Sequence, residues 1–600
     1  MNPSAFQRSE GELAVEAWRP LDRLVYRWVM RHGGTPLLAA TAAWASLAEG
    51  HGDAALPLAQ GRHGMAPLGA ADIARLRSQA LVASAPEHGV RPFALDGAGR
   101  FYLWRNHADE RAAASAILQR RGASAATPAG DAADAERLLD ELFHGQRGSA
   151  VQPQRAAVRQ VHGKRLFVLT GGPGTGKTTT VLRMLLMLQR QAGGPLAIRI
   201  AAPTGKAAQR LVQSLRQGKA NLTGHATRPL PPDWRPLLDA VPDRDALTVH
   251  RLLGYDPRRN AFRRSARDPV AADVVVVDEA SMVDLAMLRC LLGALRAEAS
   301  LVLVGDADQL TSVATGSVLL DLVSALEAAP RDDLVRLAHS FRAERELVAI
   351  NEAIRAGDGP ALEAAMAGAG KQATRHAVGE ERALGVRVRR WAQDLAGNAG
   401  LRPLPVAGDA PQEPRARAAL AALAGRQLLC ALREGPFGAL AINAALEAAL
   451  RRAWGIAPGT EWYPGRAVII TRNDYAAGLF NGDIGICLAD ADGSMRVWFE
   501  ASGEDAGAVR SFTPHLLPAH EGAFALTIHK SQGSEYDHAA ILLPPDAGNR
   551  ILSRQLIYTG ASRARRSLEI WASDAALAAA LATEVNRSGG LQPRLKAGGH

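Results

Sequence analysis

Hydrophobic residues near the middle of the chain fall in short unbroken runs, and stretches of helical period separate these runs. RLFVLT, AIRIAA, VVVVDE and LVLVGD are such runs, and they lie between residues 165 and 306. A strand that is apolar along its whole length is buried on both faces, as in a parallel sheet covered by helices. The pattern therefore predicts an α/β fold whose first lobe spans residues 150–330.

Further along, strand-like runs follow one another with no helical period between them. RAVIIT, IGICLA, MRVWFE and VRSFT occupy residues 466–513. Such close spacing predicts a small all-β insert over residues 458–520, barrel-like if it closes. The alternation of helix and strand then returns with AAILLP and SLEIWA. We therefore expect a second α/β lobe, formed by residues 331–457 and 521–580, around the insert.

The two ends of the chain carry weaker patterns. Residues 1–135 mix apolar helical stretches with one strand-like run, RFYLWR, and they end in a segment rich in Ala, Gly and Pro. We expect a mainly α N-terminal domain that serves for docking. The tail over residues 586–600, NRSGGLQPRLKAGGH, is expected to be flexible.

Composition agrees with a globular protein of several domains. The chain has 600 residues, of which 47% are hydrophobic and 22% charged. No apolar run approaches the roughly 18 residues of a membrane span, and the N-terminus lacks the apolar core of a secretory signal. These features predict a cytoplasmic protein. Its three cysteines argue against a disulfide framework and are too few for a four-cysteine metal site.

The charge of the chain points to a polyanionic partner. The net charge is +10 and the pI is about 9.9, a balance that favours nucleic acid without proving it. Only seven of the 70 basic residues are lysines. A chain that prefers Arg keeps Lys where a compact, flexible ammonium is needed. Three of these lysines, Lys177, Lys206 and Lys530, lie in the motifs described next.

A glycine-rich loop matches the pattern G-x-x-x-x-G-K-[ST] between a predicted strand and a predicted helix. In such a loop, backbone N–H groups and the helix N-terminus bind phosphates, the lysine reaches the β- and γ-phosphates, and the hydroxyl after it ligates Mg²⁺. Lys177 and Thr178 are the lysine and the hydroxyl here. The predicted nucleotide-binding residues are Gly171, Gly172, Pro173, Gly174, Thr175, Gly176, Lys177, Thr178 and Thr179.

Acidic residues follow two further predicted strands. Asp278 and Glu279 come directly after four valines, at the strand end where open α/β sheets bind ligands. Asp278 is expected to hold Mg²⁺ and Glu279 to polarise the attacking water, although a capped helix start would also place an acidic residue there. Asp306, Asp308 and Gln309 repeat this arrangement after the next strand. Gln309 is expected to contact the γ-phosphate.

These motifs belong to a longer ordered series. AAPTGKAAQRL, TVHRLL, DEAS, GDADQL, HSFR, LTIHKSQGSEYD and LIYTGASRAR together resemble the motif series of superfamily 1 helicases, in the flavour of the 5′-to-3′ branch. GGPGTGKTTT, ALREGPFG and TRNDYAAGLFNGDIGI resemble the RecD family, the alpha subunits of exodeoxyribonuclease V. The resemblance covers about residues 150–575. It implies two RecA-like P-loop motor lobes, with an SH3-like β insert in the second.

The resemblance also implies roles for single residues at the nucleotide. Gln154 would read the adenine edge of ATP, and Arg342 and Arg563 would reach the γ-phosphate from the second lobe. Glu535 would meet either a nucleotide ribose or an arginine. With Lys177 and Asp278 on the other wall, closure of the lobes would favour the ATP state.

The same resemblance implies a sequence-blind grip on single-stranded DNA from both lobes. A single histidine such as His250 or His529 is more often a packing residue, and only the flanking motifs favour a role in DNA binding. The implied DNA-binding residues are Pro203, Thr204, Lys206, Thr248 and His250 in the first lobe, and Thr527, His529 and Lys530 in the second.

Partners and alternatives complete the prediction. The resemblance implies RecB-like and RecC-like subunits in a heterotrimer that processes duplex DNA ends for break repair. No acidic cluster outside the ATPase motifs suggests a nuclease site, so the nuclease is expected in a partner. Two alternatives stay open: a self-sufficient helicase of the same branch, and a structural DNA-binding subunit with a vestigial ATPase.

Overall fold

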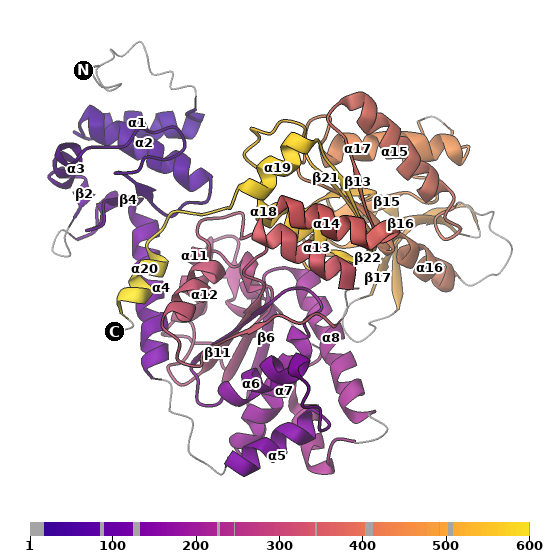
Figure 1. The fold of residues 1–600 in the computed structure, drawn as a ribbon, viewed down its shortest axis with the longest axis horizontal. Helices are drawn as coiled ribbons and strands as arrows, with labels where there is room; N and C mark the ends of the chain where they lie inside the picture. The colour runs from indigo at the N-terminus through magenta and orange to yellow at the C-terminus, as the bar shows by residue number, and fades with distance from the viewer. Residues whose placement is uncertain are drawn as a thin grey trace.

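The computed structural model describes most of the chain as an N-terminal domain, two α/β lobes and an antiparallel sheet (Figure 1). The residues described are 17–84, 89–123, 132–224, 229–244, 247–341, 345–402, 412–457, 459–474, 476–490, 492–501 and 508–598. Among them, no helix combines the length and apolarity needed to cross a membrane.

Lobe 1 is built on a six-stranded sheet in which every neighbouring pair of strands is parallel. Its strands, in spatial order, are β12 (Leu334–Leu337), β5 (Leu166–Gly171), β11 (Ser300–Gly305), β10 (Val274–Val277), β6 (Ile198–Ala202) and β7 (Leu247–Thr248). The apolar runs therefore form the predicted parallel sheet, whose carboxyl ends share one edge.

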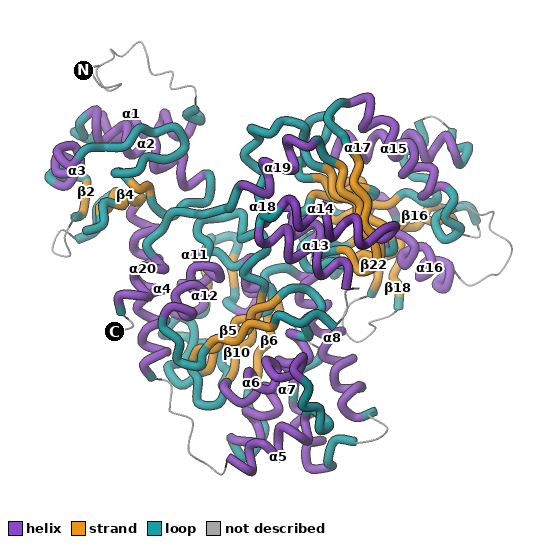
Figure 2. Tube along the Cα trace, in the orientation of Figure 1, coloured by secondary structure: helices purple, strands orange, loops and turns teal. Residues whose placement is uncertain are grey.

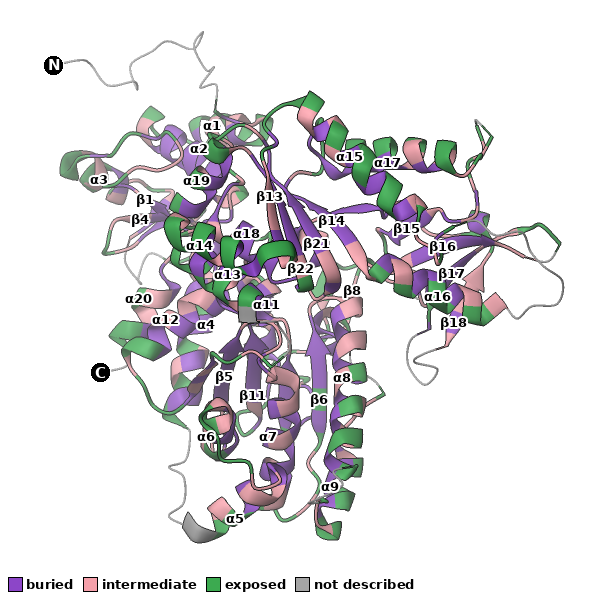
Figure 3. Cartoon of the chain, turned by 45° about the vertical axis from the view of Figure 1, so that its right-hand side comes forward, coloured by how far each residue is buried: buried purple, intermediate pink, exposed green. Residues whose placement is uncertain are grey.

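Helices cover both faces of this sheet because successive strand residues point to opposite sides. Val275 and Val277 pack into one hydrophobic cluster, whereas Val274 and Val276 pack into another. Figure 3 shows the strands of this sheet as largely buried. The first cluster includes residues of α4 (Trp104–Gly122), α10 (Val249–Leu252), α11 (Leu285–Gly293) and α12 (Val318–Ala328). The second includes residues of α5 (Ala132–Leu142), α6 (Gln152–Gln160), α7 (Lys177–Gln191), α8 (Gly205–Thr223) and α9 (Arg235–Ala240).

Lobe 2 repeats this architecture with a five-stranded parallel sheet. In spatial order its strands are β13 (Ala373–His376), β22 (Ala564–Trp571), β21 (Tyr536–Leu542), β14 (Arg426–Cys430) and β20 (Ala525–Thr527). Its helices are α13 (Arg345–Ala356), α14 (Gly359–Ala369), α15 (Glu381–Ala396), α16 (Gln412–Ala424), α17 (Ala439–Ala453), α18 (Arg554–Ala561) and α19 (Asp574–Ala582). Figure 2 shows the two parallel sheets as separate groups of strands.

A five-stranded antiparallel sheet lies beside lobe 2, where the sequence predicts the β insert. Its order is β18 (Val509–Phe512), β17 (Met495–Glu500), β16 (Ile484–Ala489), β15 (Ala467–Ile470) and β19 (His520–Gly522). Val468, Cys487 and Val497 face a small cluster of its own, whereas Ile469 and Ile486 join the large core of lobe 2. Alternation along the strands thus gives the sheet two buried faces.

The N-terminal domain contains more strand than the predicted single run. Helices α1 (Pro20–Arg31), α2 (Pro36–Gly50) and α3 (Ala70–Arg77) accompany a four-stranded sheet of β1 (Leu56–Pro57), β4 (Arg100–Leu103), β3 (Phe93–Leu95) and β2 (Val82–Ala83). Such short strands offer too few positions for a period of two to stand out in the sequence. A separate hairpin, β8 (Tyr255–Asp256) and β9 (Ala261–Phe262), follows α10.

The prediction of a flexible tail over 586–600 is wrong for residues 586–598. The chain returns from lobe 2 to lobe 1 and forms α20 (Leu591–Ala597). Leu591 and Leu595 are buried in the lobe 1 core beside residues of α4. Two leucines four residues apart are the only apolar signal in this Gly- and Arg-rich segment, so its helix depends on packing rather than on local sequence. Residues 599–600 lie outside the described part.

Candidate active site

The P-loop joins β5 to α7 with the geometry that phosphate binding requires. Gly174 and Gly176 have φ values of 73° and 81°, and Gly176 caps the N-terminus of α7. A side chain at Gly171 would collide with the Leu337 carbonyl oxygen, 2.6 Å from an ideal Cβ. The Lys177 ammonium donates to the carbonyl oxygens of Gly171 and Gly172, at 2.7 and 2.9 Å. The lysine therefore lies across the mouth of the loop.

Gln154 packs against this loop from α6. Its side-chain amide is buried and donates to the carbonyl oxygen of Thr175 at 3.0 Å. An ideal Cβ on Gly176 would come within 2.5 Å of the same amide nitrogen, so glycine is needed there for the close approach as well as for its φ. The structure thus places Gln154 next to the P-loop.

Asp278 and Glu279 follow β10 at the same edge of the sheet. Glu279 has a φ of 52°, a left-handed conformation that costs a non-glycine residue about 1–2 kcal/mol. Burial and the neighbouring Glu279 charge raise the pKa of Asp278 to about 6, while Lys177 acts in the opposite direction. The two adjacent carboxylates make this strand end a favourable place for a cation.

The available oxygen ligands fit Mg²⁺. Asp278 and Thr178 line one cavity, and carboxylate and hydroxyl oxygens are ligands that this hard cation prefers. In the described part of the chain, no group of three or more His, Cys, Asp or Glu side chains could hold a metal without help. Mg²⁺ commonly takes one or two protein ligands and completes its shell with water and phosphate.

Asp306 and Gln309 come next to these groups from β11. The Gln309 amide donates to the Asp306 carboxylate at 2.9 Å, and the Tyr558 hydroxyl donates to the same oxygen at 3.1 Å. Among the described residues, the Gln309 Oε1 atom is buried and has no hydrogen-bond partner. Asp308 turns away to accept from Arg336 at 3.0 Å. Gln309 therefore lines the cavity and keeps one buried acceptor atom without a partner in the part of the chain that the structure describes.

Arg563 brings the second lobe to the cavity. It lies two residues after the end of α18 and is 2% exposed. It lines the same cavity of about 500 Å³ as Lys177, Asp278, Glu279 and Gln309. Its guanidinium donates to the carbonyl oxygens of Thr559 at 2.9 Å and Ser534 at 3.3 Å. These bonds fix the group at the cavity wall. Arg342, the other predicted arginine, lies outside the described residues.

Comparison with known proteins agrees with this two-lobed cleft. Residues 154–315 match the family model of the AAA domain, and residues 522–570 match that of the UvrD-like helicase C-terminal domain. The RecBCD enzyme subunit RecD of Mycobacterium tuberculosis is 39% identical over 453 residues, covering 74% of this chain and 73% of that protein. The same subunit of Mycolicibacterium smegmatis is 36% identical over 528 residues, covering 87% and 86%. This chain belongs to the RecD family.

Membership confirms the prediction of a superfamily 1 helicase: this RecD-family chain is an ATP-dependent DNA helicase. A further relative, the ATP-dependent RecD2 DNA helicase of Deinococcus radiodurans, is 31% identical over 477 residues. The match covers 79% of this chain but only 55% of that protein.

Direct contacts between the lobes of this RecD-family chain were missed by sequence reasoning. The backbone amide of Leu310 donates to the Thr559 hydroxyl at 2.8 Å, and the side-chain amide of Gln532 donates to the Leu310 carbonyl oxygen at 3.0 Å. Arg210 of α8 donates to the Gly533 carbonyl. All these residues lie within the quoted motifs, but the sequence contains no signal of which residue in one lobe meets which in the other.

Glu535 meets an arginine, one of the two partners predicted for it. Its carboxylate accepts from Arg565 at 2.9 Å. Glu535 also lines a second hollow beside Gly171 and Tyr558.

Three threonines predicted to bind DNA also cap helical turns. The Thr204 hydroxyl accepts from the Ala207 amide at 3.2 Å, and the Thr248 hydroxyl accepts from the Arg251 amide at 3.2 Å. Thr527 makes the same kind of bond with the Lys530 amide, at 3.3 Å. A capping hydroxyl still has a hydrogen to donate, so the caps are compatible with a phosphate contact. Pro203 directly precedes the first of them.

The basic residues predicted to bind DNA occupy different surroundings. Lys206 lines the same cavity as Lys177, where burial lowers the pKa of its ammonium to about 7 against the opposing charges of Asp483 and Glu500. The His250 ring packs edge-on against Tyr255, with centroids 5.4 Å apart. Lys530 pairs with Glu521 at 2.7 Å, and burial lowers the pKa of His529. These four groups therefore differ in burial and in their contacts.

Proposed function

We propose that this chain moves 5′ to 3′ along single-stranded DNA as the alpha subunit of an exodeoxyribonuclease V complex. The observation that carries the proposal is the cavity into which Lys177 and Asp278 project from lobe 1 and Arg563 from lobe 2. A ligand that fills such a cavity favours the closed arrangement of the lobes, and its hydrolysis removes that preference.

In this proposal ATP lies across the P-loop, with Gln154 at the adenine and Lys177 at the β- and γ-phosphates. Asp278 and Thr178 hold Mg²⁺, which neutralises charge on the phosphates. Glu279 polarises the attacking water, and the buried Gln309 carbonyl oxygen orients it. Arg563 and Arg342 stabilise the charge that develops on the transferred phosphoryl group.

The DNA-binding residues are proposed to act on the backbone of one strand from both lobes. Thr204, Thr248 and Thr527 each offer a hydroxyl hydrogen at the start of a helical turn, where backbone N–H groups also favour phosphate. Since none of these groups reads a base, the grip tolerates any sequence. The insert of five antiparallel strands is proposed to be an SH3-like domain beside this track.

We further propose RecB-like and RecC-like partners in a heterotrimer, with the nuclease in a partner and the N-terminal domain as the docking face. Helix α1 supports this, because Leu21, Leu24 and Trp28 are 58%, 58% and 40% exposed. Their spacing of three and four residues places them on one side of the helix. Exposed apolar stripes of this kind mark protein interfaces.

The self-sufficient helicase remains the alternative, and purification separates the two. The alpha subunit should co-purify with two further chains and unwind a 5′-tailed duplex weakly until they are added. A chain that elutes alone and unwinds the same duplex at full rate would contradict the proposed assembly.

We expect Lys177→Gln to lower kcat for DNA-stimulated ATP hydrolysis about 10²- to 10³-fold, because the variant removes a positive charge from the developing transition state. Steady-state hydrolysis with saturating oligo(dT) measures this. Lys371→Gln, at an exposed site outside the cavity, is the matched control. Equal rates for the two variants would favour the vestigial ATPase, particularly if unwinding from the 5′-ended strand also survived.

Thr204→Asp tests the DNA grip without breaking the helix cap. Aspartate caps helices at least as well as threonine, so the unfolding temperature should change little. The new carboxylate would face phosphate, and we expect the Kd for oligo(dT) to rise at least about tenfold. Thr35→Asp is the control, because Thr35 caps α2 in the N-terminal domain with a 3.3 Å bond to the Leu38 amide. Fluorescence anisotropy should show equal affinities only if Thr204 lies off the DNA.

A further inference from the structure

The C-terminal segment 583–598, here called the C-terminal strap, connects three parts of the molecule (Figure 1). It leaves lobe 2 where the Arg554 amide donates to the Thr583 carbonyl at 2.9 Å. It ends in α20, which packs against α12 of lobe 1 and against α4, the helix that leaves the N-terminal domain. Any relative movement of these parts therefore strains or shifts the strap.

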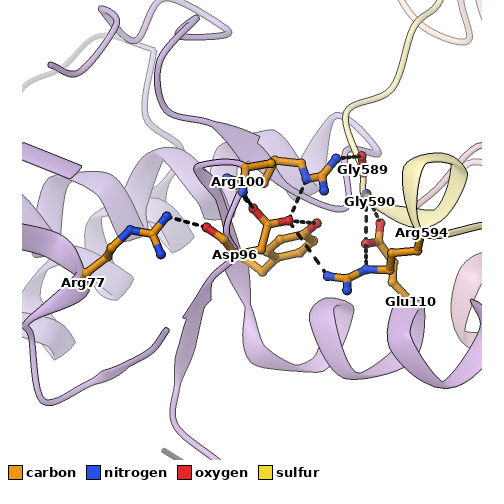
Figure 4. A network of polar contacts seen from close by, with 9 residues as sticks. Arg77, Asp96, Arg100, Glu110, Gly589, Gly590 and Arg594 are labelled. Atoms are coloured by element: carbon orange, nitrogen blue, oxygen red, sulfur yellow. Dashed lines mark hydrogen bonds and ion pairs between the residues drawn. The ribbon is translucent and has the colours of Figure 1, made fainter. Parts of the chain in front are cut away.

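The strap is fixed to the N-terminal domain and α4 by main-chain hydrogen bonds (Figure 4). The Gly590 amide donates to the buried Glu110 carboxylate, at 2.8 and 2.9 Å, and Arg100 donates to the Gly589 carbonyl at 3.4 Å. An ideal Cβ on Gly590 would lie 2.4 Å from the Tyr102 hydroxyl. Only glycine permits this close approach, so the strap is held in register.

Further anchorage comes from residues just before Gly589. The Ser588 carbonyl accepts from the Ala54 and Ala55 amides at 2.8 and 3.1 Å, and the Ser588 amide donates to the Asp53 carboxylate at 2.6 Å. The strap therefore pairs with residues 53–55 like an added edge of the N-terminal domain.

Arg587 extends from this anchored segment to lobe 1. Its guanidinium donates to the carbonyl oxygens of Ala314 and Gly316, at 2.6 and 3.0 Å. The Gly316 amide in turn donates to the carbonyl of Gly52, at 2.9 Å. Asp53 of the N-terminal domain and Asp321 of α12 attract the Arg587 charge from two sides. Strap, N-terminal domain and lobe 1 thus meet at Arg587.

Ala314 and Gly316, which accept from Arg587, lie at the end of a lobe 1 loop. The beginning of the same loop reaches the cavity. Residues 306–316, here called the relay loop, begin with Asp306, which accepts a hydrogen bond from Gln309, and Gln309 lines the cavity. At Leu310 the loop bonds to Thr559 and Gln532 of lobe 2. One short loop therefore contacts the predicted γ-phosphate position, the second lobe and the Arg587 junction.

We infer that Arg587 is a positioning residue that transmits the nucleotide-linked movement of the relay loop to the N-terminal domain. The inference rests on the proposed ATP cycle at the cavity and adds a mechanical connection to it. Because Arg587 joins two carbonyls of the loop to a strap fixed by Gly590, the loop end and residues 52–55 move together. A partner docked on the N-terminal domain would thereby influence hydrolysis without contacting the nucleotide.

The test compares Arg587→Ala, Arg587→Lys and the exposed control Arg452→Ala in the full chain. Alanine should lower kcat for DNA-stimulated ATP hydrolysis about fivefold and leave KM for ATP within about twofold, the scale of coupling contacts remote from a ligand. Lysine keeps a cationic donor and should recover most of the loss. Unchanged kcat in a stably folded alanine variant would overturn the inference, as would a loss that lysine and alanine share equally.

Amide hydrogen exchange gives a second measurement, which uses the wild-type chain and so does not depend on whether a variant folds. In the wild-type chain, a non-hydrolysable ATP analogue should change exchange both in peptides covering 312–317 and in peptides covering 52–56. A change confined to the first set would overturn the inference. If Lys177→Gln leaves hydrolysis intact, the proposed ATP cycle at the cavity is wrong. If Lys177→Gln is inactive but the exchange of residues 52–56 does not change, only the proposed connection through Arg587 is wrong.

Discussion

Replacing Arg563 by alanine is expected to lower kcat for DNA-stimulated ATP hydrolysis by about 10³-fold, the loss typical of removing an arginine that contacts a transferred phosphoryl group. The guanidinium lies 2% exposed at the cavity wall, where little solvent screens its charge. That loss corresponds to about 4 kcal/mol of transition-state stabilisation. Single-turnover hydrolysis in the presence of oligo(dT) measures it directly.

Arg563 also supports its own surroundings, so the experiment needs two controls. Its bonds to the Thr559 and Ser534 carbonyls join α18 to the turn before β21, and their loss lowers the free energy of unfolding. Arg563→Lys keeps a positive charge but lacks the planar guanidinium with its several N–H donors. It therefore shows whether charge alone is sufficient for hydrolysis. Arg566→Ala removes an arginine three residues away whose side chain is 74% exposed. If Arg563→Ala unfolds at the wild-type temperature and hydrolyses ATP at the rate of Arg566→Ala, Arg563 takes no part in the chemistry.

The strand ends and the P-loop of the candidate site could be predicted from the sequence, because each depends on residues that are neighbours along the chain. Unbroken apolar runs predicted the strand that ends at Gly171 and the strands that directly precede Asp278 and Asp306. The P-loop pattern predicted the helix after the loop, and this helix begins at Lys177. Parallel strands end at a common edge, so the convergence of these residues followed from the fold class. Glycines with positive φ were predictable for the same reason, because the loop has few other ways to turn.

Contacts between distant segments could not be predicted in this way. The bond from Leu310 to Thr559 joins residues 249 positions apart, and neither residue type indicates a partner. The capping role of Thr204 and Thr248 follows from the pattern of a hydroxyl directly before a helix, which is present in both motifs. The strap was missed because its helix is stabilised by burial of Leu591 and Leu595 in a core formed by other segments.

Glu279→Gln is expected to reduce hydrolysis by about 10³-fold while ATP binding is retained, since the variant keeps the shape of the side chain and loses its ability to accept a proton. Glu279 is held in a left-handed conformation directly after Asp278, and an ideal Cβ on Gly533 of lobe 2 would lie 3.8 Å from its carboxylate. The backbone therefore aims this carboxylate at the interface of the lobes. Rapid-quench hydrolysis and nucleotide binding should be measured on the same preparation.

The charge of Glu279 allows its role to be separated from that of a metal ligand. At present the Glu279 carboxylate helps to raise the pKa of Asp278 to about 6. Neutralising Glu279 removes this repulsion, so the pKa of Asp278 falls and its ionised form persists to lower pH. The Mg²⁺ concentration for half-maximal ATP binding should then stay the same or decrease in Glu279→Gln, whereas it should increase in Asp278→Asn. An increase in both variants would mean that Glu279 holds the metal, and a different group would have to polarise the water.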